Sequence, residues 1–108
     1  MSKPTDLVQG TLDLLLLKIL ALEPLHGWAI SLRLKSISGD VLQVTEGSLY
    51  PALHKLENEE MVESYDAIEN GRPRRYYRIT GKGRRMLAKD REEWRRMSRA
   101  VTLIPGKA

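Results

Sequence analysis

Three arginines, Arg72, Arg74 and Arg75, directly follow the dipeptide Asn70-Gly71. Asn-Gly is the preferred pair in two-residue β-hairpin turns, so these arginines are predicted to lie at a hairpin tip and on its returning strand. Guanidinium groups donate hydrogen bonds in a fork that matches phosphate oxygens. Such a hairpin can reach phosphates or a minor groove if it lies beside nucleic acid. Otherwise it is a charged turn that blocks edge pairing.

Positive charge is concentrated in one segment of the chain. Residues 1–70 hold five Lys or Arg and eleven Asp or Glu, whereas residues 71–96 hold eleven Lys or Arg and three Asp or Glu. The net charge of +4 over all 108 residues hides this asymmetry. The concentration favours a polyanion, most often nucleic acid, over an anionic membrane surface or a merely solvated helix face.

A second candidate site is an amphipathic helix predicted over residues 45–57 and running to about Glu60. Its buried face has i, i+3, i+4, i+7 spacing, at Leu49, Ala52, Leu53 and Leu56. The other side offers small and hydrogen-bonding side chains that suit a DNA major groove, and the candidate contacts are Ser48, Tyr50, Pro51, His54 and Lys55. An ordinary surface helix has the same pattern, so this stretch alone does not distinguish a DNA-binding helix from a surface helix.

The first turn of this helix has two possible starts. Thr45 is a good N-cap whose hydroxyl is expected to accept from the Ser48 amide. Pro51 would then remove the hydrogen bond to the Gly47 carbonyl, which a start at Ser48 avoids. The sequence leaves both starts open.

The remaining reactive side chains have no arrangement typical of an enzyme. There is no cysteine, which excludes disulfides and thiolate metal sites. His26 and His54 stand alone, and we expect His26, at a turn, to make a structural hydrogen bond. A group of carboxylates is interpreted as a solvated face: Glu57, Glu59, Glu60 and Glu63. We therefore predict no enzymatic activity, no cofactor and no metal.

Two further helices are predicted before the candidate site. Residues 12–22 are apolar nearly all round, so the first helix should be buried on more than one side, with Leu12 and Leu16 facing a partner chain. A turn at His26 precedes a second helix, in which Trp28 is expected to belong to the core. Residues 38–40 should close this helix.

Strands are predicted at three places. A brief one is expected over residues 41–44, and two longer ones over residues 61–66 and 75–79 would form the hairpin. Alternation places Tyr76 and Tyr77 on opposite sides, so one of them should lie in the core.

A long last helix is predicted after Thr80, its N-cap, and should stop at residues 105–106. Two series recur along it at seven-residue spacing: Leu87, Trp94 and Val101, and Asp90, Met97 and Ile104. Such a heptad-like seam has nothing left in its own chain to pack on, so the predicted partner is a second copy.

The order of elements predicts a mainly α fold with a small β-hairpin. We assign residues 1–80 to a winged helix-turn-helix DNA-binding domain, residues 81–104 to a dimerisation helix and residues 105–108 to a tail. A dimer would read a palindromic DNA site with half-sites about one turn apart. The alternative is a winged-helix module for protein–protein contact. No segment suits a membrane span or a signal peptide, so a cytosolic location without a membrane partner is expected.

The chain resembles the PadR family of bacterial transcriptional regulators. The matching stretches run in order over roughly residues 7–96: GTLD at 10–13, PLHGWAI at 24–30, GSLYPAL at 47–53, LE at 56–57, GRPRRYY at 71–77 and ITGKG at 79–83. Each piece is weak alone, and together they are specific. Trp28 departs from the tyrosine usual in the family, which affects packing only.

The resemblance implies a dimeric winged-helix repressor, of the short type with one C-terminal helix. It implies DNA contacts from the third helix (Ser48, Tyr50, Pro51, His54 and Lys55) and from the wing (Arg72, Arg74 and Arg75). Some drug-sensing relatives stack planar aromatic ligands on a tryptophan of the last helix, which Trp94 resembles, with Asp90 and Met97 beside it. A Trp94 that only fills the dimer seam needs no ligand, and this interpretation is slightly favoured.

Overall fold

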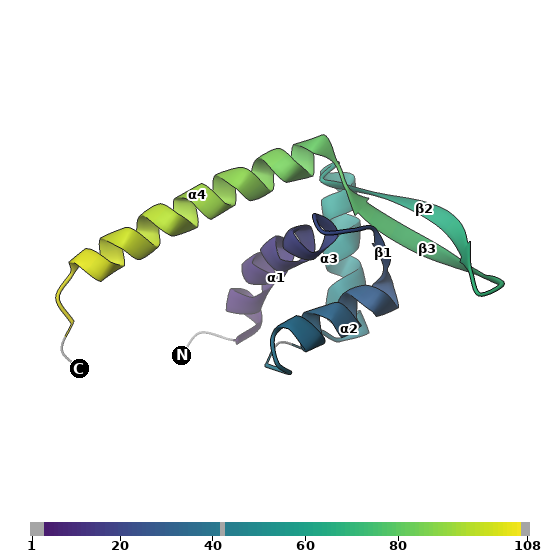
Figure 1. The fold of residues 1–108 in the computed structure, drawn as a ribbon, viewed down its shortest axis with the longest axis horizontal. Coiled ribbons are helices and arrows are strands. Elements are labelled where there is room, and N and C mark those ends of the chain that lie inside the picture. The colour runs from purple at the N-terminus through teal and green to yellow at the C-terminus, as the bar shows by residue number, and fades with distance from the viewer. Residues whose placement is uncertain (1–3, 42, 107–108) are drawn as a thin grey trace.

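The computed structural model describes residues 4–41 and 43–106. Four helices and three short strands follow one another along the chain: α1 (Pro4–Leu20), β1 (Leu25–His26), α2 (Gly27–Ile37), α3 (Glu46–Asn58), β2 (Val62–Glu69), β3 (Arg72–Ile79) and α4 (Gly81–Leu103). The hairpin of β2 and β3 extends from one side of the helix cluster, and α4 runs away on the other side (Figure 1). Within the described residues, no helix is both long and apolar enough to cross a bilayer.

Helix α1 lies at the centre of the core because α2, α3 and α4 all contact it. This arrangement corrects our expectation for Leu12 and Leu16. We expected them to face a second copy, but they are 2% and 0% exposed within their own chain. A helix that is apolar nearly all round is here covered by neighbours of the same chain, so the burial needs no partner.

The hairpin is longer than the sequence pattern indicated. Asn70 and Gly71 have φ values of 52° and 77°, which is the positive-φ pair required by a tight two-residue turn. The two eight-residue strands therefore pair from Glu69 opposite Arg72 down to Val62 opposite Ile79. The strands continue to the turn itself, whereas we had expected them to end several residues earlier.

The third strand of the sheet is not where we expected it. Residues 41, 43 and 44 are not in a strand, and Leu42 lies outside the described residues. Instead Leu25 and His26 pair antiparallel with Tyr77 and Tyr76, which gives the sheet order β1-β3-β2. A two-residue strand is too short to show periodicity, so the sequence could not distinguish it from a turn.

Trp28 corrects another expectation, because its side chain is 59% exposed and not in the core. In α2 the buried positions are Gly27, Ile30 and Leu34. Trp28 lies roughly 130° away from the centre of that face at 100° per residue. Of the two tyrosines, Tyr77 is the buried one, as the alternation of the strand predicts, and burial raises the pKa of its phenol.

Helix α3 begins at Glu46, with Thr45 as its N-cap. The expected bond to the Thr45 hydroxyl is absent. The Ser48 amide donates instead to the Thr45 carbonyl oxygen at 3.0 Å. Pro51 lies inside the helix, so the earlier of the two possible starts is the one adopted.

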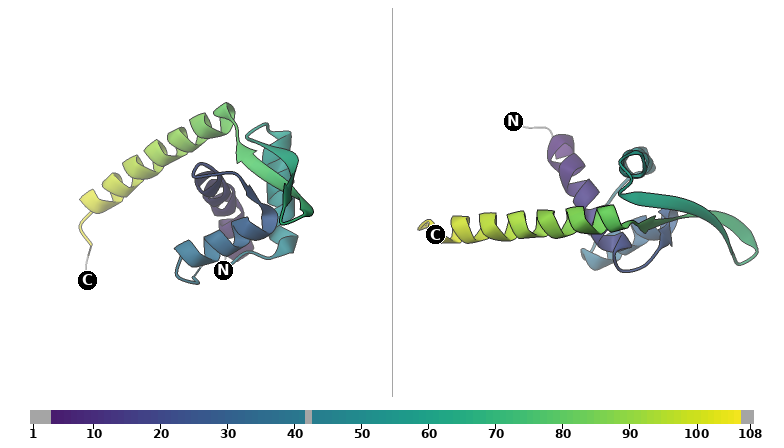
Figure 2. Two further views of the ribbon diagram at one scale, coloured as in Figure 1. Left: turned by 45° about the vertical axis from the view of Figure 1, so that its right-hand side comes forward. Right: turned by 90° about the horizontal axis from the view of Figure 1, so that it is seen from above.

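Helix α4 is capped as expected, because the Thr80 Oγ1 accepts from the Gly83 amide at 3.1 Å. Leu87, the first member of the predicted dimer seam, is instead buried in the core of its own chain, which corrects that expectation. Later members are exposed: Trp94 by 67%, Met97 by 62%, Val101 by 63% and Ile104 by 68%. Figure 2 shows this end of α4 standing clear of the other elements.

Candidate nucleic-acid interface

The outer face of α3 is the first part of the candidate interface. Leu49, Ala52, Leu53 and Leu56 are buried, as predicted, so they orient the helix. Opposite them lies an exposed line of residues: Gly47, Pro51, His54 and Asn58. This line has two small or cyclic residues and two side chains that form hydrogen bonds, which fits close approach to a groove. Asn58 was not among our predicted contacts, although its helical position places it one turn beyond His54.

Tyr50 and Lys55 lie on opposite flanks of that line. The Lys55 Nζ contacts the Asp13 Oδ2 of α1 at 2.7 Å, and this hydrogen bond raises the pKa of Lys55. Lys55 is thus charged but held towards α1. The Tyr50 ring of α3 packs against Gly27 at the start of α2. A side chain at position 27 would collide with it, because a Cβ there would lie 2.5 Å from the Tyr50 Oη. Gly27 therefore allows α2 and α3 to pack closely at this point.

A shallow hollow lies between Tyr50 and the wing, which is the hairpin of β2 and β3. It has a volume of about 170 Å³ and is lined by the start of α2, by Tyr50 and by β3: His26, Gly27, Trp28, Tyr50, Pro73, Arg74, Arg75 and Tyr77. Three elements that are distant in sequence thus form one concave surface that carries two arginines. Exposed Trp28 belongs to it, and the helical spacing from Ile30 and Leu34 would have revealed that Trp28 faces away from the core.

The wing arginines point to different faces, because alternate residues of a strand lie on opposite sides. Arg74 shares one face with Tyr76 and Arg78, and Arg75 shares the other with buried Tyr77. Both have acidic neighbours: Arg74 Nε is 3.4 Å from Glu69 Oε2, and Arg75 Nε is 3.6 Å from Asp66 Oδ1. Arg72 makes no ion pair with any residue that the structure describes. The pairing of Arg74 and Arg75 with these carboxylates was not among our expectations from the sequence.

His26 connects the wing to α2. Its Nδ1 accepts from the Ala29 amide at 3.2 Å, so the ring proton is on Nε2, which lies 3.0 Å from Glu69 Oε2. The expected structural hydrogen bond of His26 is therefore confirmed. Tyr76 packs edge-on against the imidazole, with ring centroids 5.5 Å apart. The pKa of Tyr76 is raised mainly by burial and secondly by the negative charge of Glu69.

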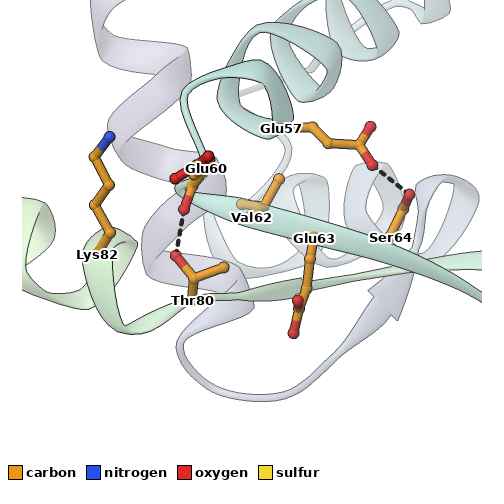
Figure 3. Close-up of a pocket in the computed structure, with 7 residues that line it drawn as sticks. All are labelled: Glu57, Glu60, Val62, Glu63, Ser64, Thr80 and Lys82. Atoms are coloured by element: carbon orange, nitrogen blue, oxygen red, sulfur yellow. Dashed lines mark hydrogen bonds between the residues drawn. The ribbon is translucent and has the colours of Figure 1, made fainter.

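A larger hollow at the base of the wing has the wrong charge for nucleic acid. It measures about 480 Å³, and Lys82 is its one cationic lining residue against three carboxylates, those of Glu57, Glu60 and Glu63. Ser64 Oγ donates to Glu57 Oε2 at 2.5 Å, and Thr80 Oγ1 donates to the Glu60 carbonyl at 2.6 Å (Figure 3). These bonds attach the hairpin to the end of α3. We interpret this region as a structural joint.

A third hollow lies between α1 and α4. It has a volume of about 430 Å³ and is lined by Leu14, Leu15, Lys18, Arg91 and Trp94. The structure thus places Trp94 in a partly apolar hollow, whereas Asp90 and Met97, the other two suggested ligand contacts, do not line it.

Comparison with known proteins decides the family. The model of the transcriptional regulator PadR-like family matches residues 16–89. The chain belongs to this family. The match includes α2, α3 and the whole wing, so the PadR-like chain is a DNA-binding transcriptional regulator with a winged-helix fold, and not an enzyme.

Solved structures and curated relatives agree with the family. A PadR-like transcriptional regulator from Bacillus cereus has 30% sequence identity and a TM-score of 0.81, and the similarity covers 94% of this chain and 99% of that one. A PadR-like transcription factor from Bacteroides fragilis has the same identity and TM-score, over 94% and 96% of the chains. The protein named transcriptional regulator Rv3488, from Mycobacterium tuberculosis, is 41% identical over 59 residues, or 55% of each chain.

Proposed function

We propose that this PadR-like protein is a homodimeric repressor that occupies a palindromic operator. The observation that carries the proposal is the row of exposed apolar side chains on α4, Trp94, Met97 and Val101, which Ile104 continues directly after the helix. Its seven-residue spacing fits a helix that packs on its own copy. A twofold dimer would present two α3 helices and two wings, and it would block transcription from a promoter that overlaps the operator.

The proposed DNA contacts are those expected from the sequence. Residues of α3 would contact bases, and arginines of the wing would contact phosphates. Ser48, Tyr50, Pro51, His54 and Lys55 lie on α3. Of these five, only His54 is a polar side chain on the exposed line opposite the buried face. Base reading should therefore be sparse. Arg72, Arg74 and Arg75 would contact phosphates, which supply affinity with little sequence preference. Lys55 would add charge from the flank, beside Asp13.

The test combines mass, footprint and transcription. Light scattering should give the mass of two chains, and cleavage protection on the protein's own upstream DNA should cover two related half-sites. Transcription in vitro from that promoter should fall when the protein is added. Val101→Glu places a charge in the apolar row and should give monomers that bind the same DNA at least tenfold more weakly.

Ala88→Glu, on an exposed position of α4 outside the row, is the matched control and should remain dimeric. A parent protein that stays monomeric at micromolar concentration, or a single unpaired protected half-site, would contradict the dimer. Activation of transcription by bound protein would contradict the repressor role.

The hollow beside Trp94 supports a second role, in which a planar aromatic molecule enters it and releases the repressor from DNA. Its lining combines leucines with the indole ring, which suits stacking. Fluorescence of Trp94, measured in a Trp28→Phe variant, should be quenched by such molecules at concentrations that also release DNA. If no planar compound quenches the Trp94 fluorescence of the dimer, the partner chain alone fills the hollow and the ligand role is wrong.

A further inference from the structure

We propose that Asp66 and Glu69 set the DNA affinity of the wing, because they hold Arg75 and Arg74 in ion pairs that a phosphate must replace. This inference rests on the proposed contact between the wing and DNA. Asp66 and Glu69 would determine how strongly the wing binds DNA and how this binding depends on salt. They are two acidic residues at a surface that is proposed to bind a polyanion.

The register of the hairpin produces the pairs. The two-residue turn places Asp66 opposite Arg75 and Ala67 opposite Arg74. Glu69, two residues further along β2 on the same face as Ala67, reaches Arg74 diagonally. One carboxylate therefore accompanies each of Arg74 and Arg75, with one pair on each face of the wing.

These two pairs are loose. At 3.4 Å and 3.6 Å both are ionic contacts without a hydrogen bond, and the Arg74 Nε is buried without any hydrogen-bond partner. A donor without a hydrogen bond gains when it turns to an oxygen with better geometry. The Arg74 side chain as a whole is 39% exposed, so it can turn outward to a DNA phosphate, which offers such oxygens.

Arg78 shows what a firm pair in the same hairpin looks like. Its Nε donates to Glu63 Oε1 at 2.6 Å, and its guanidinium lies 4.8 Å from the centre of the Tyr65 ring. Arg78 is thus occupied by two partners near the base of the wing. The pair of Glu63 and Arg78 provides an internal control with the same charges.

The exchange has a thermodynamic signature. Each arginine that binds a phosphate releases a counterion from DNA, but the carboxylate left behind attracts a cation in return. Binding should therefore depend less steeply on salt than the number of phosphate contacts implies. After the exchange, the carboxylate of Asp66 or Glu69 remains near the DNA phosphates. Repulsion between these negative charges lowers the affinity for any DNA sequence.

Asp66→Asn and Glu69→Gln test the inference in the full-length protein. Both keep the shape of the side chain, and in Glu69→Gln the new amide oxygen could still accept from His26. Affinity for a short random-sequence duplex is measured by fluorescence anisotropy between about 50 and 200 mM KCl. Each variant should bind about two- to fivefold more tightly than the parent at low salt, in line with the worth of an exposed pair. The plot of log affinity against log salt should be steeper by up to about one unit per variant.

Glu63→Gln adds the same unit of charge but frees Arg78 at the base of the wing, so it should change affinity and slope less. If Asp66→Asn and Glu69→Gln do no more than Glu63→Gln, only net charge matters and the inference fails. Thermal unfolding midpoints show whether the variants remain folded, and a stability change without a change in slope also overturns it. If Arg74→Ala plus Arg75→Ala binds like the parent while the parent binds DNA, the wing contact itself is wrong.

Discussion

Gly83 and Gly81 are two glycines in the first turn of α4 with opposite structural roles. A methyl group on Gly83 would overlap the backbone carbonyl oxygen of Met61, at the point where α4 crosses the start of the wing. The nearest atom to a methyl group on Gly81 is the end of the Arg85 side chain, at 3.4 Å. Gly83 is therefore required by packing, while Gly81 is only a weak helix former.

We expect Gly83→Ala to lower the free energy of unfolding by about 3 kcal/mol, because a backbone atom cannot move aside as a side chain can. Gly81→Ala should leave it unchanged or raise it by up to about 1 kcal/mol. Urea unfolding followed by circular dichroism measures both. Equal stabilities of the two variants would show that α4 does not press on Met61 in solution.

At the scale of elements, the proposed DNA contacts are divided between α3 and the wing. The central line of α3 has few side chains able to distinguish bases, whereas the wing carries three arginines near its tip. Contacts to phosphates fix position and add affinity, and contacts to base edges distinguish sequences. Removing side chains from one element should therefore leave the contribution of the other in place.

Arg72→Ala combined with Arg74→Ala should weaken binding to operator and random duplexes alike. The salt dependence should become shallower by about one unit for the lost Arg72 contact, and by less for Arg74, whose partner Glu69 takes up a cation on binding. His54→Ala should mainly reduce the preference for the operator over random DNA, by about tenfold, corresponding to roughly 1–3 kcal/mol for a base contact. Competition binding with both duplexes distinguishes these outcomes. A loss of preference in the arginine variant alone would reverse the two assignments.

Sequence patterns predicted the elements well where the signal is local. The Asn70-Gly71 turn, the buried face of α3 and the Thr80 cap each depend on residues within a few positions of one another. Register could also have been counted outward from the turn, which would have placed Asp66 opposite Arg75. The contact between His26 and Glu69 and the packing of three other helices on α1 join distant segments, and no local pattern contains that information.

At the scale of the whole molecule, the wing and the apolar end of α4 lie on opposite sides of the helix cluster (Figure 1). A dimer joined through α4 would keep both wings at its outer ends, free to reach DNA. The helix cluster between them has a core that is formed within the single chain. Dimerisation and DNA contact would thus use separate surfaces of one small chain.

The projecting α4 also affects how the protein would behave in hydrodynamic measurements. The radius of gyration is 15.8 Å, and the chain extends 57 Å along its longest axis against 28 Å and 23 Å along the others. A compact domain of this length would have a radius of gyration of about 13 Å. A single chain should therefore migrate through a gel-filtration column faster than a globular protein of its mass. Elution volume alone would overstate the number of subunits.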